Sequence, residues 1–285
     1  MQPLVSVVVP MYNAAFYIKE TLNSVMGQSY NFVEVIVVND GSTDNSLKLV
    51  EDFILEQALN NKSIYLINKH NTGVSDSRNI GLRHSKGEFV LFLDADDVLE
   101  RNFISNKIPF LNSNHDFVGS VVKFFNTQIS SVFDVRVSIT ENIPFNVLFY
   151  KSDMVTCPSS YIYNKNFLLS NSIIFNSKLN STADREFLLS VAFNNGKGVL
   201  DQLENSALLY RVHQQSMSNV FNEKLINDNS LYYKIAIEKG LIPIDIKQKS
   251  LLKGYSILFK SYFRLGKILL ALKFGFEWLK IYSKL

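Results

Sequence analysis

The stretch Phe89-Val-Leu-Phe-Leu-Asp94-Ala95-Asp96-Asp97 joins a continuous apolar run to three carboxylates. Such a run is typical of a strand buried on both faces, as in a parallel sheet covered by helices. Because side chains alternate along a strand, we expect Asp94 and Asp96 to project to one side and Asp97 to the other, where it would cap a following helix. Asp94 and Asp96 are predicted to bind Mg²⁺ or Mn²⁺ on a diphosphate, since these cations prefer oxygen ligands.

Three more apolar runs precede this stretch, at Val5–Val9, Val33–Val38 and Ile64–Ile67. Helix-like segments separate them, one after Ser42-Thr43-Asp44 and one from 74 to 84. This alternation predicts an α/β domain with a mostly parallel central sheet flanked by helices. We expect the domain to cover residues 1–220 and a C-terminal helical region to cover 221–285.

Polar residues follow the predicted strands at the edge where open α/β sheets bind ligands. The first strand ends in Pro10-Met-Tyr12-Asn13 without a glycine, so a Gly-x-Gly-x-x-Gly fingerprint or a Walker loop is absent there. Asp40 ends the second strand. Arg78 lies in the early turns of the 74–84 helix, where its guanidinium would pair with Asp94, contact a phosphate or form a purely structural ion pair.

The composition is that of an ordinary globular protein, with 47% hydrophobic residues and a formal net charge of +3. The single cysteine, Cys157, cannot form an internal disulfide, which favours a reducing compartment such as the cytoplasm. The first apolar run lacks a preceding basic segment and is too short for a signal peptide. No run of about 18 uncharged apolar residues predicts a membrane span.

Positive charge is concentrated in the tail, where residues 251–285 carry a formal charge of +6 and the rest of the chain −3. A helical projection predicts two helices that meet near Gly266. It places basic residues on nearly opposite faces, with Lys253, Lys260, Arg264 and Lys267 on one and Lys273, Lys280 and Lys284 on the other. Two interpretations stand: binding to an anionic membrane at the inner face of the plasma membrane, or a hairpin packed on itself or a partner.

Four motifs together resemble the family 2 inverting glycosyltransferases with the A-type fold, of the bacterial polysaccharide type. In chain order they are Val5-Ser-Val-Val-Val-Pro-Met-Tyr-Asn13, Val38-Asn-Asp-Gly-Ser-Thr-Asp44, Asn71-Thr-Gly-Val-Ser-Asp-Ser-Arg-Asn-Ile-Gly81 and Asp94-Ala-Asp96. Their combination over roughly the first hundred residues is far more specific than any one of them.

The resemblance implies roles for the residues at these motifs. Nucleoside contacts fall to Pro10, Tyr12, Asn13 and Asp40. Asp94 would hold the ribose or a metal-bound water, and Asp96 the metal on the diphosphate. Arg78 and Ala95 belong to the same nucleotide-sugar site.

The resemblance continues more weakly into Ser181-Thr-Ala-Asp184-Arg-Glu186-Phe187 and Tyr210-Arg-Val-His213-Gln-Gln-Ser-Met-Ser218. It implies that Asp184 is the catalytic base, although Ala183 replaces the Glu that family members commonly have. Glu186 is the rival, and two helix positions differ by about 200° in direction, so only one of the two acids can face the site. His213 or Ser218 would touch metal or phosphate, with a solvated histidine as the alternative.

Together these residues predict a metal-dependent enzyme that moves a sugar from a nucleoside diphosphate, with UDP favoured, to an acceptor hydroxyl with inversion. The acceptor would be a growing glycan or a lipid-linked saccharide, with residues 112–182 as its wall. A non-catalytic nucleotide-sugar binding protein and a nucleotidyltransferase are the alternatives. Nucleic acid is not expected as a partner, and a homo-oligomer is left open.

Overall fold

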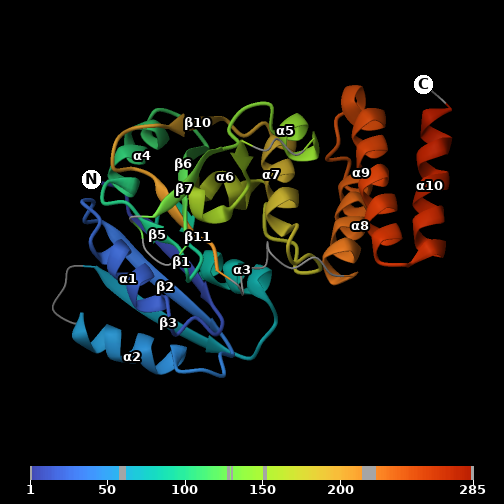
Figure 1. Ribbon diagram of the computed structural model, residues 1–285. Coiled ribbons are helices and arrows are strands. Elements are labelled where there is room, and N and C mark those ends of the chain that lie inside the picture. Colours follow the sequence, from blue (N-terminus) through green and yellow to red (C-terminus); the bar gives the residue numbers. More distant parts are fainter. Residues whose placement is uncertain are drawn as a thin grey trace.

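The computed structural model describes residues 2–57, 62–126, 129, 131–149, 153–213 and 223–283. The first four strands of the chain form a parallel sheet in the order β3-β2-β1-β4 (Figure 1). The strands are β1 (Val5–Met11), β2 (Val33–Asp40), β3 (Ser63–Lys69) and β4 (Phe89–Phe92). Side chains of β1 and β2 are buried on both faces, as their uninterrupted apolar runs predict.

The sheet continues beyond β4 with mixed strand directions. β9 (Tyr161–Asn164) lies antiparallel between β4 and β6 (Phe117–Phe125), and β11 (Leu208–Arg211) then runs parallel to β6. The remaining strands are β5 (Val98–Leu99), β7 (Val132–Ser138), β8 (Met154–Val155) and β10 (Gly198–Asp201). The predicted α/β fold with a mostly parallel sheet is confirmed, because parallel pairings outnumber antiparallel ones among the described strands.

Helices cover both faces of the sheet, so alternate β1 side chains enter different apolar clusters. Val7 and Val9 pack with α1 (Ile18–Met26), α2 (Ser46–Glu56) and α4 (Phe103–Asn112). Val8 packs on the other side with α3 (Val74–His84), α5 (Ile143–Phe149), α6 (Lys165–Ser170) and α7 (Ala183–Phe193). A Cβ on Gly81 would lie 2.1 Å from Cγ1 of Val8, so glycine allows α3 to approach β1 this closely.

The C-terminal helices are α8 (Glu223–Glu238), α9 (Ile244–Arg264) and α10 (Ile268–Tyr282). The predicted break between the last two lies at Gly266, whose φ of +71° suits glycine. The apolar cluster of α7 continues into α8 and α9 through Tyr232 and Leu258. The predicted domain boundary near residue 220 falls outside the described residues. Over the described chain, every helix is too short or too polar to span a membrane.

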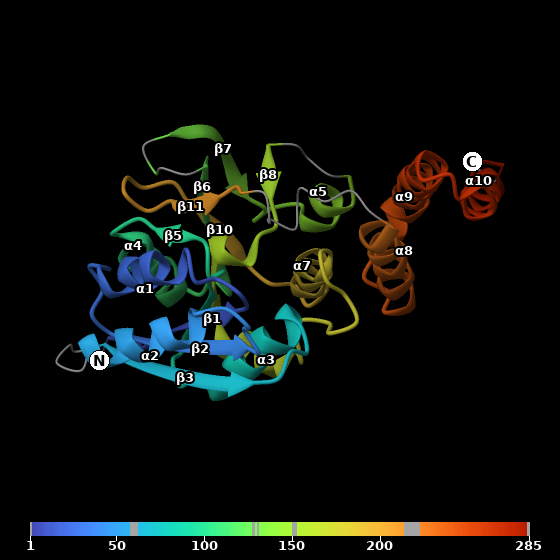
Figure 2. The ribbon, with the colours of Figure 1, turned by 60° about the horizontal axis from the view of Figure 1, so that its bottom comes forward.

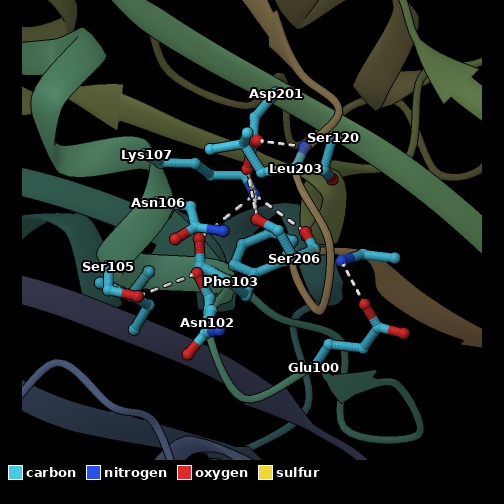
Figure 3. A network of polar contacts seen from close by, with 12 residues as sticks. Glu100, Asn102, Phe103, Ser105, Asn106, Lys107, Ser120, Asp201, Leu203 and Ser206 are labelled. Carbon is cyan, nitrogen blue, oxygen red and sulfur yellow. Dashed lines mark hydrogen bonds and ion pairs between the residues drawn. The ribbon is translucent and has the colours of Figure 1, made fainter.

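A fully buried lysine joins α4 to the segment that enters β11 (Figure 3). Lys107 Nζ lies 2.9 Å from Asp201 Oδ2 and donates to the carbonyl and hydroxyl oxygens of Ser206 at 3.1 Å each. It also lies over the Phe103 ring, 3.7 Å from the centroid. Burial lowers the pKa of Lys107 to about 8 although the Asp201 carboxylate opposes the shift, so the lysine is charged at neutral pH. This ion pair ties the segment between β10 and β11 to α4. β11 then leads to the site described below.

We expect Lys107→Met to lower the free energy of unfolding by about 3–5 kcal/mol, because it leaves the Asp201 carboxylate buried without its cation. Adding Asp201→Asn should recover part of this loss, since the uncompensated charge is then removed. Urea unfolding followed by circular dichroism measures both variants. As the control, Lys48→Met removes an exposed ion pair with Asp52 and should leave the urea midpoint almost unchanged. A double variant less stable than the single variant would contradict this account.

Candidate active site

The three acids lie in a turn and not on the strand, because β4 ends at Phe92. The Asp97 amide donates to the Asp94 carbonyl at 3.1 Å, so the strand-alternation argument for their directions does not apply. Asp94 and Asp96 are nevertheless partly exposed while Asp97 is 1% exposed. The expected helix-capping role of Asp97 is wrong: β5 follows it, and its Oδ1 accepts from the backbone N–H of Arg211 on β11. Burial, with the nearby Asp96 and Asp94 charges, raises the pKa of Asp97 well above its usual range.

Asp94 is held by groups from two other segments. Its Oδ1 lies 2.5 Å from the Arg78 guanidinium of α3, which is the first of the pairings expected for that arginine. Its backbone N–H donates to Ser159 Oγ at 3.0 Å. The Arg78 guanidinium also lies 5.0 Å from the centroid of the Phe175 ring. A 5% exposed arginine with these contacts fixes the Asp94 carboxylate in place.

Asp96 faces His213, whose Nε2 lies 2.9 Å from Asp96 Oδ2. The Tyr17 ring lies against the imidazole, with the two ring centroids 4.8 Å apart and the planes tilted by 30°, so the histidine is not simply solvated. Burial and then the Asp94 charge raise the pKa of Asp96, against the opposing effect of His213. Ser218, the other residue expected near phosphate, lies outside the described residues.

A divalent cation fits this donor set. Two carboxylates that repel each other beside an imidazole would be stabilised by a positive ion, and Mn²⁺ accepts both ligand types. Within the described ranges no group of three or more His, Cys, Asp or Glu side chains has metal-binding geometry. Magnesium-like ions commonly take only one or two protein carboxylates and complete their shell with substrate phosphates and water. Asp96 and His213, with Asp94 beside them, are therefore the residues that would hold the ion.

Arg211 ties the acidic turn to its neighbours. Its Nε donates to the Asp96 carbonyl at 2.9 Å, and its Nη2 pairs with Glu20 on α1. The guanidinium lies 5.0 Å from the Tyr17 ring centroid. This arginine, 5% exposed, was not predicted as a site residue, although it stands two positions before His213. It holds the turn, α1 and the end of β11 in one arrangement.

The residues expected to bind the nucleoside lie at the ends of β1 and β2. Asp40 accepts from the backbone N–H groups of Thr72 at 2.8 Å and Gly73 at 2.9 Å, and pairs with Lys69. These contacts fix the turn before α3. Pro10 is the sixth residue of β1, and Asn13 Oδ1 accepts from the Thr43 amide at 2.8 Å.

Tyr12 differs from these residues because it is 51% exposed. A flat aromatic side chain at the carboxyl ends of the strands is a surface on which a base can stack.

Ala95, the middle residue of the Asp94-Ala95-Asp96 motif, is 8% exposed. Its carbonyl accepts from Thr21 Oγ1 at 2.9 Å and so joins the acidic turn to α1.

Asp184 opens onto a cavity of about 440 Å³. Burial raises its pKa, while a hydrogen bond from Thr156 Oγ1 to Asp184 Oδ2, 2.5 Å long, opposes the shift. Glu186 points elsewhere: it is fully buried and its Oε1 lies 2.7 Å from Nζ of Lys239, in the turn that follows α8. Of the two rival acids, only Asp184 faces the cavity. Aromatic and charged side chains also line it, including Phe124, Phe133, Asp134, Arg136, Arg185 and Tyr210.

A four-residue segment joins the two parts of the site. Thr156 binds the Asp184 carboxylate, and Ser159 accepts from the backbone of Asp94. Neither residue is predicted from the sequence as part of a site, because a Thr and a Ser in an irregular region carry no recognisable pattern. Tyr17, Arg211 and Thr156–Ser159 become identifiable only from their contacts.

The helix that carries Asp184 is also held from the C-terminal region. Asp228 on α8 accepts from the backbone N–H groups of Asn180 and Thr182 and from the Ser181 hydroxyl, each at 2.9 Å. Together with the Lys239 contact to Glu186, this fixes both the start and the inner face of α7. The predicted helical appendage therefore contributes to the geometry of the site.

Comparison with known proteins places this chain in a family. The model of the Glycosyl transferase family 2 matches residues 6–172. An uncharacterized glycosyltransferase of Haemophilus influenzae is 29% identical over 297 residues, which cover 93% of this chain and 87% of that protein. The poly(ribitol-phosphate) beta-N-acetylglucosaminyltransferase TarS of Staphylococcus aureus is 30% identical over 212 residues, which cover 74% of this chain but 36% of TarS.

Solved structures show the same fold. The crystal structure of TarS residues 1–349 in complex with UDP-GlcNAc has a TM-score of 0.63 at 21% identity and covers 90% of this chain and 81% of that one. The mannosyltransferase PcManGT from Pyrobaculum calidifontis in complex with GDP-Man and Mn²⁺ has a TM-score of 0.66 at 19% identity, over 96% of this chain and 74% of that one.

Asp228 lies beyond the matched residues 6–172, and its role is testable alone. We expect Asp228→Asn to lower the free energy of unfolding by about 1–3 kcal/mol, because the charge-assisted bonds to the 180–182 turn are weakened. Amide hydrogen exchange at Asn180 and Thr182 should accelerate. Glu238→Gln is the control, since this acid on the same helix is 62% exposed by side chain. Equal exchange rates in both variants would show that Asp228 does not hold the turn.

Proposed function

The chain belongs to the glycosyl transferase family 2, and on this premise we propose that it transfers a sugar from a UDP-sugar to an acceptor hydroxyl with inversion. The observation that carries the proposal is the Thr156–Ser159 segment, which connects the Asp184 carboxylate to the acidic turn at Asp94. Such an arrangement sets a proton acceptor beside a diphosphate site, as a direct displacement at the anomeric carbon requires.

The donor occupies the carboxyl ends of β1, β2 and β4 in this proposal. Tyr12 supplies an exposed aromatic face for the base, while Pro10, Asn13 and Asp40 shape the nucleoside pocket through the turns that they hold. The UDP-GlcNAc complex of TarS supports a uridine donor, because TarS is 30% identical to this chain over the aligned residues. Arg78 acts through Asp94, whose carboxylate it orients toward the ribose.

Asp96 and His213, with Asp94, would hold a divalent cation. Bound there, the metal neutralises charge on the departing diphosphate. The Mn²⁺ in the PcManGT structure supports this assignment. The hydrogen bond from Arg211 to the Asp96 carbonyl holds the acidic turn next to the segment that carries His213.

The acceptor occupies the cavity beside Asp184. Phe124, Phe133 and Tyr210 offer apolar faces to a sugar ring, and residues 124–157 supply most of the wall, within the expected 112–182. Asp184 takes the proton from the acceptor hydroxyl as its oxygen attacks the anomeric carbon, and Thr156 fixes the orientation of this carboxylate. A growing glycan or a lipid-linked saccharide is the proposed acceptor, and TarS, a poly(ribitol-phosphate) beta-N-acetylglucosaminyltransferase, is a relative that uses a polymeric acceptor.

We expect Asp184→Asn to lower kcat by about 100-fold or more while donor binding is unchanged, because the amide cannot accept the proton. Asp134→Asn is the matched control: it removes another carboxylate from the same cavity, one that pairs with Arg136 at 2.8 Å, and should retain most of the turnover. Transfer from UDP-sugars is measured by UDP release. If turnover fell strongly in Asp134→Asn and little in Asp184→Asn, Asp184 would not be the base.

The same carboxylate predicts a pH dependence. Burial raises the pKa of Asp184, and the ionised form is the base, so kcat/KM should rise with pH through a value above the ordinary aspartate pKa of about 3.9. This acidic limb should be lost in Asp184→Asn. The anomeric configuration of the product, measured by proton NMR, tests inversion independently.

We expect Asp96→Ala to abolish the manganese-dependent part of UDP binding, because it removes a charged, partly exposed ligand from the acidic turn. Calorimetric titration of UDP with and without Mn²⁺ measures the effect. Asp52→Asn, an exposed acid on α2, serves as the control. Wild-type manganese dependence in Asp96→Ala would exclude Asp96 as a metal ligand.

A further inference from the structure

The outer face of α10 presents a row of exposed apolar side chains. Leu269 is 85% exposed and Phe276 is 62% exposed, and the neighbouring positions on this face are similar. At about 100° per residue these positions form one stripe along the helix. The α10 stripe consists of Ile268, Leu269, Leu272, Phe276 and Leu279. Its length along the helix axis is about 20 Å.

The opposite face of α10 is already used. Ala271 is buried, and Phe274 stacks on Tyr262 of α9 with ring centroids 5.4 Å apart. α10 lies alongside α9 at the end of the molecule farthest from β3, and both views show it as the outermost helix (Figures 1 and 2). The stripe is therefore not a face that the rest of the described chain covers.

An apolar groove continues the stripe toward α9. A cavity of about 410 Å³ lies between the two helices, where Phe259 and Trp278 join Leu272, Phe276 and Leu279 in its wall. Stripe and groove together form one continuous apolar surface, which a monomer in water exposes only at a cost in free energy.

Basic residues border this surface. Lys260 lies at the groove and Lys273 follows the stripe residue Leu272, and no ion pair joins either lysine to a carboxylate of the described chain. Three other basic residues of the predicted faces have partners within the chain: Lys253 donates to the Phe149 carbonyl, Lys267 pairs with Glu223 and Lys280 pairs with Glu277. Lys284 lies outside the described residues.

We propose that the α10 stripe is a docking surface for an anionic lipid bilayer, lying in the plane of the membrane. Charge complementarity carries the choice of occupant. Residues 251–285 have a formal charge of +6, so pairing two copies through this face would bring two strongly positive segments together. An apolar helix face bordered by lysines instead matches an interface where acyl chains lie beneath negative headgroups.

The chain carries its own probe for this contact. Trp278 is the one tryptophan in the sequence and lines the groove. Titration with vesicles of phosphatidylcholine containing about one third phosphatidylglycerol should shift its emission to the blue, and lipids brominated on the acyl chains should quench it. Pure phosphatidylcholine vesicles should bind at least about tenfold more weakly, and salt should weaken binding to the anionic vesicles.

Two pairs of substitutions in the full chain separate the apolar and charged contributions. Leu269→Ser with Phe276→Ser should lower partitioning about 100-fold, and Lys260→Gln with Lys273→Gln about 30-fold. Matched controls take equally exposed residues away from α10: Leu55→Ser with Ile244→Ser, and Lys178→Gln with Lys197→Gln. These controls should partition like the wild type.

Several outcomes overturn the proposal. The proposal is overturned if the wild-type protein does not bind anionic vesicles, or if it binds anionic and neutral vesicles equally well. A wild-type dimer that Leu269→Ser with Phe276→Ser dissociates, in protein that ignores vesicles, would show that a second copy occupies the stripe. Capture of an acidic protein without vesicle binding would assign the face to a protein partner. UDP-sugar hydrolysis without acceptor should be unchanged in all four double variants, so failure of the membrane proposal is distinguishable from failure of the proposed function.

Discussion

The constraint on which the site depends is the placement of Asp94, Asp96 and Asp97 in one turn at the end of a buried strand. Carboxylates at this spacing repel one another, and burial raises the pKa of both Asp96 and Asp97. Each acid is therefore compensated from a different element: Asp94 by Arg78 on α3, Asp96 by His213, and Asp97 by the backbone of β11. Compensation of these charges therefore involves α3, β11 and the residues that follow β11, which meet at the acidic turn.

The cavity beside Asp184 is built from different interactions. The wall of the cavity comes from irregular segments, and its carboxylate is held by Thr156, a residue that no local pattern selects. Stability there comes from behind: Asp228 holds the turn before α7, and Lys239 compensates the buried charge of Glu186. A buried unpaired acid is costly, so the Lys239 contact stabilises Glu186 on the face of α7 that is turned away from the cavity. The region after residue 223 thus helps to hold α7 in the orientation that turns Asp184 toward the cavity.

The sequence predicts the first half of the molecule well, because long apolar runs are local signals. Strands β1, β2, β3 and β4 and the helix from 74 to 84 lie where the periodicity places them. The position of a side chain is not predicted where it depends on contacts with residues far away in the sequence. Asp97 follows the rule for a helix cap, yet it is bound to β11, more than a hundred residues away. Arg211, Tyr17 and Asp228 have no local signature, because each acts through contacts between segments that only the folded chain brings together.

The three C-terminal helices divide two tasks by their distance from the sheet. α8 contributes polar side chains to the turn before α7, and α9 contributes Leu258 and Tyr262 to the core cluster. α10 meets only α9 in extensive contact and buries Ala271 alone, so its sequence is free of the packing constraints that shape its neighbours. A helix released from packing would ordinarily be polar on its outer face, because exposed apolar surface favours association. That α10 instead exposes leucines and a phenylalanine between lysines indicates that its outer face is fitted to a surface outside the chain.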